Sequence, residues 1–155
     1  MTDDADGRHD FDFLYGTWHV AHRQLVASGG DEWRSYDSRA ECRGVAGGLV
    51  NVDELAAGDR PLGVTVRCFD TATRRWSTYW ITREAKLIDT PVVGRFDGDV
   101  GEFHGDERLP AGTVRVRFLW TRDGADKARW EQAYSDDDGA TWETNWVIEL
   151  TRTGA

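Results

Sequence analysis

Histidines are the first residues in this chain to consider for acid–base or metal chemistry. His19 and His22 lie three residues apart in a segment where apolar and polar side chains alternate. On a strand, positions three apart point to opposite faces, so these two imidazoles cannot share a metal ion. His22 has the same parity as Trp18, and we expect it in the interior. There it is either a satisfied polar core residue or a proton-transfer group.

Other polar side chains share a face with aromatic residues. If the tryptophans point inward, the inward polar set is His22, Thr78, Gln132, Tyr134 and Thr144. In a packed core such groups would bond one another, whereas in a cavity they would orient a ligand. His22 and Tyr134 are the candidate catalysts, because their side chains can exchange protons.

Tryptophan is frequent in this chain, with 8 residues among 155. Indole rings bury a large area with few rotatable bonds, which suits them to apolar pockets and to cores. We predict that a ligand-binding cavity is walled by Trp80, Trp120, Trp130 and Trp146. Packing of a solid core is the alternative explanation for the same residues.

Strands must position these side chains, because the chain alternates with period two and shows no helical period. In the clearest strand, 141–152, one face carries Trp142, Thr144, Trp146, Ile148 and Leu150. In the run 62–69, Leu62, Val64, Val66 and Cys68 share a face. The other runs are 17–27, 33–45, 49–55, 74–82, 92–96, 100–104, 113–122 and 129–135.

About ten sequential strands joined by short turns predict an all-β fold, a single antiparallel up-and-down barrel, because closure hides the strand edges. We expect one domain at 11–155 after a flexible tail at 1–10. The apolar segment that starts at Phe11 is the predicted N-terminal plug of this barrel.

The formal net charge of −9 excludes the basic surface that nucleic acids and anionic membranes require. No signal peptide and no apolar membrane span is visible, so we expect a cytoplasmic protein. Cys42 and Cys68 show no metal-ligand spacing and are predicted to be reduced thiols. We expect no cofactor and no metal, and a homodimer stays open.

Gly16-Thr17-Trp18 opens the first long strand. This G-x-W resembles the opening signature of lipocalins and their calycin relatives, in which the tryptophan closes one end of the barrel and an arginine of the last strand packs across its ring. The resemblance implies that Arg152 contacts Trp18. The stretches 9–18, 47–54 and 91–96 are similar to an uncharacterised bacterial family of small lipocalin-like barrels, which implies a fold and a cavity but no reaction. The strand number exceeds the eight of lipocalins.

Ser135 to Trp142 matches the Asp-box pattern S-x-D-x-G-x-T-W, which is known from sialidase propellers and other β proteins. We interpret it as a hairpin turn in which aspartate caps the amides and glycine takes a positive φ. It lacks the ligand spacing of a calcium-binding EF-hand loop.

Three functions fit these residues. The favoured one is a carrier or sensor that binds a small apolar or aromatic molecule, with His22, Gln132 and Tyr134 as polar contacts. The second is a cofactor-independent enzyme of the cyclase or isomerase type that acts on a hydrophobic metabolite in the same cavity. The third is a haem-binding barrel with His22 or His104 as the axial ligand.

Overall fold

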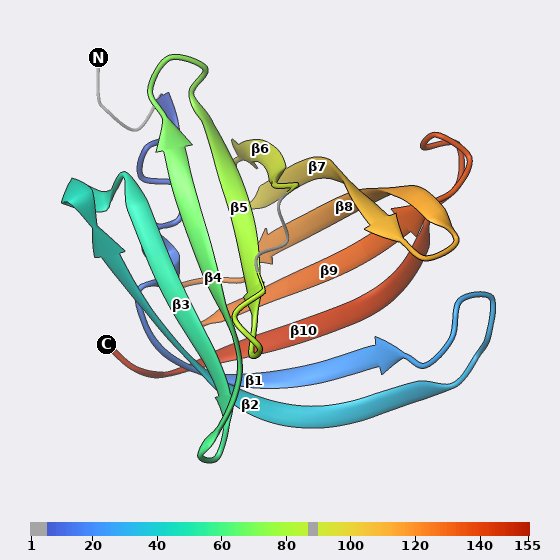
Figure 1. Ribbon diagram of the computed structural model, residues 1–155. Coiled ribbons are helices and arrows are strands. Elements are labelled where there is room, and N and C mark those ends of the chain that lie inside the picture. Colours follow the sequence, from blue (N-terminus) through green and yellow to red (C-terminus); the bar gives the residue numbers. More distant parts are fainter. Residues whose placement is uncertain (1–5, 87–89) are drawn as a thin grey trace.

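The chain forms a closed barrel of ten antiparallel strands in the computed structural model, which describes residues 6–86 and 90–155 (Figure 1). Each strand pairs with its neighbours in sequence, and the first strand pairs with the last to close the ring. The predicted all-β up-and-down barrel is therefore confirmed. The strands are β1 (Gly16–Leu25), β2 (Trp33–Val45), β3 (Val50–Ala57), β4 (Arg60–Asp70), β5 (Arg75–Thr82), β6 (Val92–Asp97), β7 (Val100–Leu109), β8 (Gly112–Arg122), β9 (Lys127–Ser135) and β10 (Glu143–Gly154).

Helix is confined, within the described residues, to short 3-10 turns such as η2 (Asp12–Leu14) and η3 (Ala46–Gly48). None of the helices in that part of the chain is long and apolar enough to cross a membrane.

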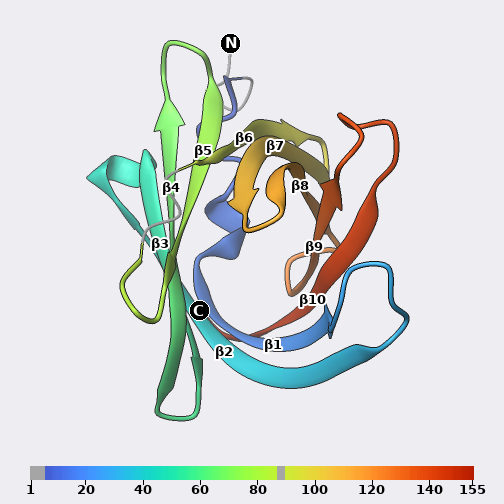
Figure 2. The ribbon, with the colours of Figure 1, turned by 45° about the vertical axis from the view of Figure 1, so that its right-hand side comes forward.

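The segment that contains η2 lies inside the ring of strands and plugs one end of the barrel (Figure 2). Phe11 and Leu14 are both buried there. The ring of Phe11 meets those of Trp76 and Phe96 edge to face, with centroids 5.1 and 5.2 Å apart. These aromatic contacts anchor the plug to β5 and β6.

The division into a tail at 1–10 and a domain at 11–155 stays a prediction, and residues 1–5 lie outside the described part. Within the described part, the indole Nε1 of Trp76 donates a hydrogen bond to the carbonyl of Gly7.

Arg152 of β10 lies across the ring of Trp18, with its guanidinium carbon 4.3 Å from the ring centroid. The same guanidinium donates hydrogen bonds to the carbonyls of Phe13 and Tyr15. The indole N–H of Trp18 in turn donates to the carbonyl of Leu14 at 2.8 Å. The predicted contact between Arg152 and Trp18 is confirmed, and it ties the plug to the last strand.

The β3 and β4 strands turn polar side chains into the barrel. Asp53, Thr65 and Arg67 are buried, whereas Val64 and Val66 on the other face are only partly buried. The apolar face predicted for 62–69 is thus the outer face of β4. Cys68 lies on this outer face while Cys42 is buried on the inner side of β2, and both thiols are free. The prediction of unpaired cysteines is confirmed.

A β-bulge interrupts β10 where it pairs with β9. Thr144 lies opposite Ala133 and Trp146 lies opposite Gln132, so Asn145 is an extra residue between them. A single inserted residue reverses the alternation of side chains. The prediction that Trp142 and Thr144 share a face with Trp146, Ile148 and Leu150 is therefore wrong.

Among the described residues, the pairing between β5 and β6 is the shortest of the ten strand pairings. It extends over Trp76 to Thr78, opposite Val92 to Gly94, whereas β1 and β2 pair from Gly16 to Leu25. The barrel wall therefore has a weakly bonded seam beside β6.

Candidate functional site

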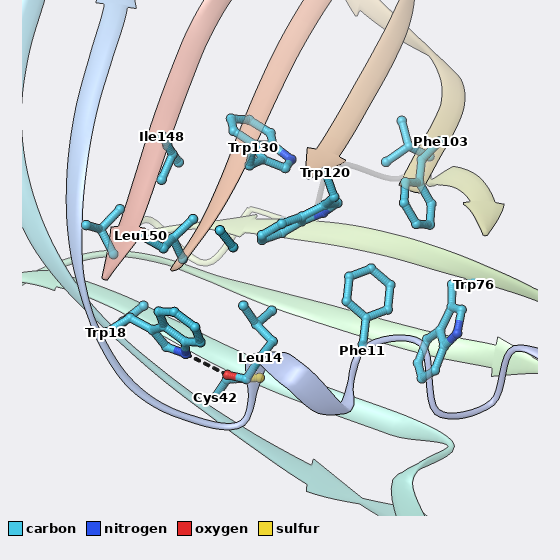
Figure 3. Close-up of a cluster of buried hydrophobic side chains, with 14 of the residues drawn as sticks. Phe11, Leu14, Trp18, Cys42, Trp76, Phe103, Trp120, Trp130, Ile148 and Leu150 are labelled. Carbon is cyan, nitrogen blue, oxygen red and sulfur yellow. Dashed lines mark hydrogen bonds between the residues drawn. The ribbon is translucent and has the colours of Figure 1, made fainter. Parts of the chain in front are cut away.

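The barrel encloses a cavity of about 340 Å³ to which all ten strands contribute side chains. This volume lies at the small end of the range for ligand pockets, roughly 300–1,000 Å³. The plug closes one end, where Leu14, Trp18 and Trp120 line the cavity. Figure 3 shows Phe11 and Leu14 projecting from the N-terminal segment toward Trp120 and Trp18. The cavity is consequently a pocket with a closed floor.

Indole rings form much of the cavity wall. Trp80, Trp120, Trp130 and Trp146 all line it, as the sequence predicts for a cavity. Trp146 is nearly perpendicular to Trp130 and to Trp80, with ring centroids 5.3 and 6.4 Å apart. We call Trp80, Trp130 and Trp146 the aromatic corner. Edge-to-face packing holds each ring in place and leaves apolar surface toward the cavity.

Polar groups gather at the end of the cavity away from the plug. The hydroxyl of Tyr134 donates to Oε2 of Glu107 at 2.6 Å, and Nε2 of Gln132 donates to Oδ1 of Asn145 at 2.9 Å. Tyr134, Glu107 and Gln132 line the cavity, as does Thr78 deeper in the barrel. Burial, together with the hydrogen bond to Glu107, raises the pKa of the Tyr134 phenol above its usual value of 10.

Thr144 and His22 are not among the cavity-lining residues. The bulge at Asn145 explains why Thr144 points away from the cavity, because Thr144 pairs with the outer-face residue Ala133. We therefore withdraw Thr144 from the cavity-facing set.

His22 lies in the wall of the barrel behind Trp146. Its ring stacks on Tyr36 with centroids 4.3 Å apart, and it is only 2 % exposed. Nε2 is 2.7 Å from Oγ of Ser38, and Nδ1 accepts a hydrogen bond from the indole of Trp146. Burial lowers the pKa of His22 from 6.5 to about 4. Both ring nitrogens are occupied and the ring is neutral near pH 7, which describes a satisfied core histidine.

The predicted haem ligands do not fit an axial site in this cavity. His22 has no free nitrogen, and His104 is on the outer side of β7, where it contacts Glu102 at 3.2 Å and the ring of Trp142. An axial ligand needs an unshared nitrogen directed at the iron. Among the described residues, no cluster of three or more histidine, cysteine or acidic side chains could hold a metal ion.

A buried ion pair near the plug was missed by the sequence reasoning. Nη1 of Arg67 is 2.6 Å from Oδ2 of Asp53 and donates to Oδ1 of Asn51 at 3.0 Å. The guanidinium lies 5.1 Å from the ring centroid of Phe11 and 5.7 Å from that of Trp120. Arg67 and Asp53 both line the cavity. In both 50–53 and 64–67, valines alternate with polar residues. This shared pattern is the sequence signal that the polar faces of two strands meet inside the barrel.

The chain matches no family model and no curated protein. Among solved structures, the crystal structure of Rv2717c from M. tuberculosis is similar, with a TM-score of 0.57 and 13% identity, covering 92% of this chain and 94% of that one. At this identity the likeness shows the barrel fold alone.

Two further barrels align with lower scores. The redesigned β-barrel b11L5F_LGL has a TM-score of 0.41 and 11% identity, covering 94% of this chain and 96% of its own. EF1p2_mFAP2b bound to DFHBI has a TM-score of 0.43 and 10% identity, covering 95% of this chain and 99% of its own.

Proposed function

We propose that this barrel binds a small apolar or aromatic molecule in its tryptophan-lined cavity, as a carrier or sensor. The observation that supports this proposal is the open volume between the indole rings: about 340 Å³ remains inside the barrel after the side chains and the plug are in place. Protein cores are normally packed without voids much larger than a water molecule. An apolar cavity of this size therefore suits a ligand better than it suits a core.

The polar groups of the lining would orient the molecule. Gln132 and Thr78 line opposite parts of the wall, on β9 and β5, and Tyr134 lies next to Gln132 on the same face. A few polar positions within an apolar pocket are the usual source of specificity. We include these three residues and the four cavity tryptophans in the proposed ligand-binding site.

The resemblance to small lipocalin-like barrels is part of this proposal. It is supported by the stack of Arg152 on Trp18 and by the closed end that this pair and the plug create. Barrels of similar size can hold one small ligand in their interior.

An enzyme of the cyclase or isomerase type is less well supported than a carrier. The candidate catalysts were His22 and Tyr134. His22 holds a neutral ring with both nitrogens engaged, and the pKa of Tyr134 is raised, so neither side chain exchanges protons readily near pH 7.

Calorimetric titration with a panel of neutral aromatic molecules tests the proposal, together with native mass spectrometry of the protein as purified. Trp130→Phe and Trp142→Phe form a matched pair, because Trp130 lines the cavity and Trp142 packs against Arg117 outside it. We expect Trp130→Phe to weaken binding several-fold, in line with roughly 1 kcal/mol for an aromatic contact, and Trp142→Phe to leave it unchanged. The proposal fails if no member of the panel binds, or if both variants lose affinity equally.

A further inference from the structure

The charged residues of the cavity lining determine which kind of ligand it can accept, and this inference rests on the proposed function. They are Asp53, Arg67, Asp106 and Glu107. Arg67 is the only cation among the described lining residues, and it is already paired with Asp53 at 2.6 Å. The Nε of Arg67 has no hydrogen-bond partner among the described residues, but an anion that approached it would lie beside the Asp53 carboxylate, whose negative charge repels it.

Glu107 is the acid best placed to meet a ligand. Its Oε2 accepts the hydrogen bond from Tyr134, a neutral partner that orients the carboxylate without cancelling its charge. Asp106 differs, because it lies 4.0 Å from Nε of Arg115 in an exposed pair. The polar end of the cavity therefore carries a negative charge that nothing in the described lining balances.

The aromatic corner also favours a positively charged ligand. The faces of indole rings carry partial negative charge, so they attract cations and repel anions. Trp130 and Trp80 meet Trp146 at 88° and 90°, so faces in more than one orientation border the open volume. The uncompensated carboxylate therefore opposes an anion at the polar end of the cavity, and the indole faces oppose it in the aromatic corner.

We propose that the cavity takes an amphiphile with an apolar or aromatic body and a cationic amine, and that it discriminates against carboxylates. The body lies among the indole rings of the aromatic corner, and the ammonium group lies near Glu107 and Tyr134. The attraction between opposite charges is stronger in such a partly enclosed site than in bulk water.

Three probes with one ring system test this proposal on the wild-type protein: naphthylmethylamine, naphthylmethanol and naphthoate, measured by calorimetry at pH 7. We expect the amine to bind roughly tenfold more tightly than the carboxylate, with the alcohol between them. An alcohol that equals or exceeds the amine, or a carboxylate that binds most tightly, overturns the charge proposal and leaves cavity binding intact. If none of the three binds, the proposed function fails and the charge proposal fails with it.

Glu107→Gln and Glu102→Gln isolate the contribution of the carboxylate. Both variants remove one negative charge from β7, but Glu102 is on its outer side next to His104. Glutamine keeps an oxygen that can accept the Tyr134 hydrogen bond. We expect Glu107→Gln to lower the affinity for naphthylmethylamine to the affinity for naphthylmethanol. Glu102→Gln should leave the affinities for both molecules unchanged. Equal effects of the two variants would contradict a local role for Glu107.

Asp53→Asn tests the neutralisation of Arg67 from the opposite direction. The substitution keeps the shape of the side chain and leaves the guanidinium without its carboxylate. We expect naphthoate to gain roughly tenfold in affinity and the amine to gain nothing. An unchanged preference in a folded Asp53→Asn variant, checked by circular dichroism, would contradict the argument that Asp53 cancels Arg67. If this variant does not fold, the three naphthyl probes on the wild-type protein still test the charge proposal.

Discussion

The indole N–H of Trp146 donates a hydrogen bond to Nδ1 of His22 across 3.1 Å. An indole nitrogen can only donate, so Nδ1 must be unprotonated and the ring proton must be on Nε2. Nε2 then donates to Oγ of Ser38. This chain of bonds sets the tautomer of His22 and fixes one wall of the cavity, which makes His22 a positioning residue for Trp146.

A loss of stability on acidification follows from this arrangement. The pKa of His22 is about 4 in the folded protein and 6.5 for the free side chain, so the unfolded chain takes up the proton first as the pH falls. The contribution of neutral His22 is present above pH 6.5 and is lost between pH 6.5 and 4, by an amount on the order of 3 kcal/mol. Urea denaturation at several pH values measures it.

His22→Gln and His19→Gln are the matched variants for this measurement. His19 lies on the outer face of the same strand, 3.7 Å from Asp37. We expect His22→Gln to flatten the dependence of the free energy of unfolding on pH and His19→Gln to preserve it. A parallel decline in all three proteins would show that other groups cause it.

Gly63→Ala should reshape the cavity. A Cβ atom at Gly63 would overlap Cη2 of Trp80, so the indole ring must move. We expect weaker binding of naphthylmethanol by calorimetry and a loss of about 1–3 kcal/mol of stability from overpacking. In Gly154→Ala the new Cβ meets Thr17 at 3.7 Å, an ordinary contact, and both properties should stay as in the wild type.

Arg152→Met should loosen the plug. It removes the guanidinium from the ring of Trp18 and leaves the carbonyls of Phe13 and Tyr15 without their donor. We expect a loss of about 1–3 kcal/mol in guanidinium chloride denaturation. Arg23→Met is the control, because Arg23 covers Trp33 at 5.1 Å near the hairpin between β1 and β2, away from the plug. A control variant as unstable as Arg152→Met would argue against a special role of the plug.

Asp137→Ala should weaken the hairpin between β9 and β10. Asp137 accepts hydrogen bonds from the hydroxyl of Ser135 and from the backbone and side chain of Thr141, and these bonds lower its pKa to about 2. We expect a lower Tm at pH 7 for Asp137→Ala than for Asp136→Ala. Since the folded pKa is depressed, the deficit should shrink as the pH falls from 4 toward 2. A Tm equal in both variants would contradict the structural role assigned to this turn.

The alternation of side chains predicted the inner face of strands whose tryptophans fall on one side. Trp76, Thr78 and Trp80 of β5 lie on the inner face, as do Trp130, Gln132 and Tyr134 of β9. The split is clear in β9 and less decisive in β5, where Tyr79 and Ile81 lie on the opposite face, and the face with the larger aromatic area is the one that is buried.

The same alternation did not reveal the orientation of β4 or the bulge of β10. Val64 and Val66 face outward while Arg67 and Asp53 form an ion pair inside, an arrangement that depends on two strands meeting in register. The extra residue at Asn145 appears only when β9 is paired with β10. Contacts between neighbouring strands determine the orientation of β4 and the bulge of β10. The periodicity of a single strand therefore cannot predict either feature.

The seam beside β6 has a dynamic consequence. In the described part of the chain only three residue pairs join β5 to β6, so separating these two strands breaks fewer bonds there than separating β1 from β2. Local opening follows the least protected bonds, and the amide hydrogens that join β5 to β6 should exchange with deuterium sooner than those in the middle of β1. This part of the wall should therefore lose its protection against exchange before the plugged end does.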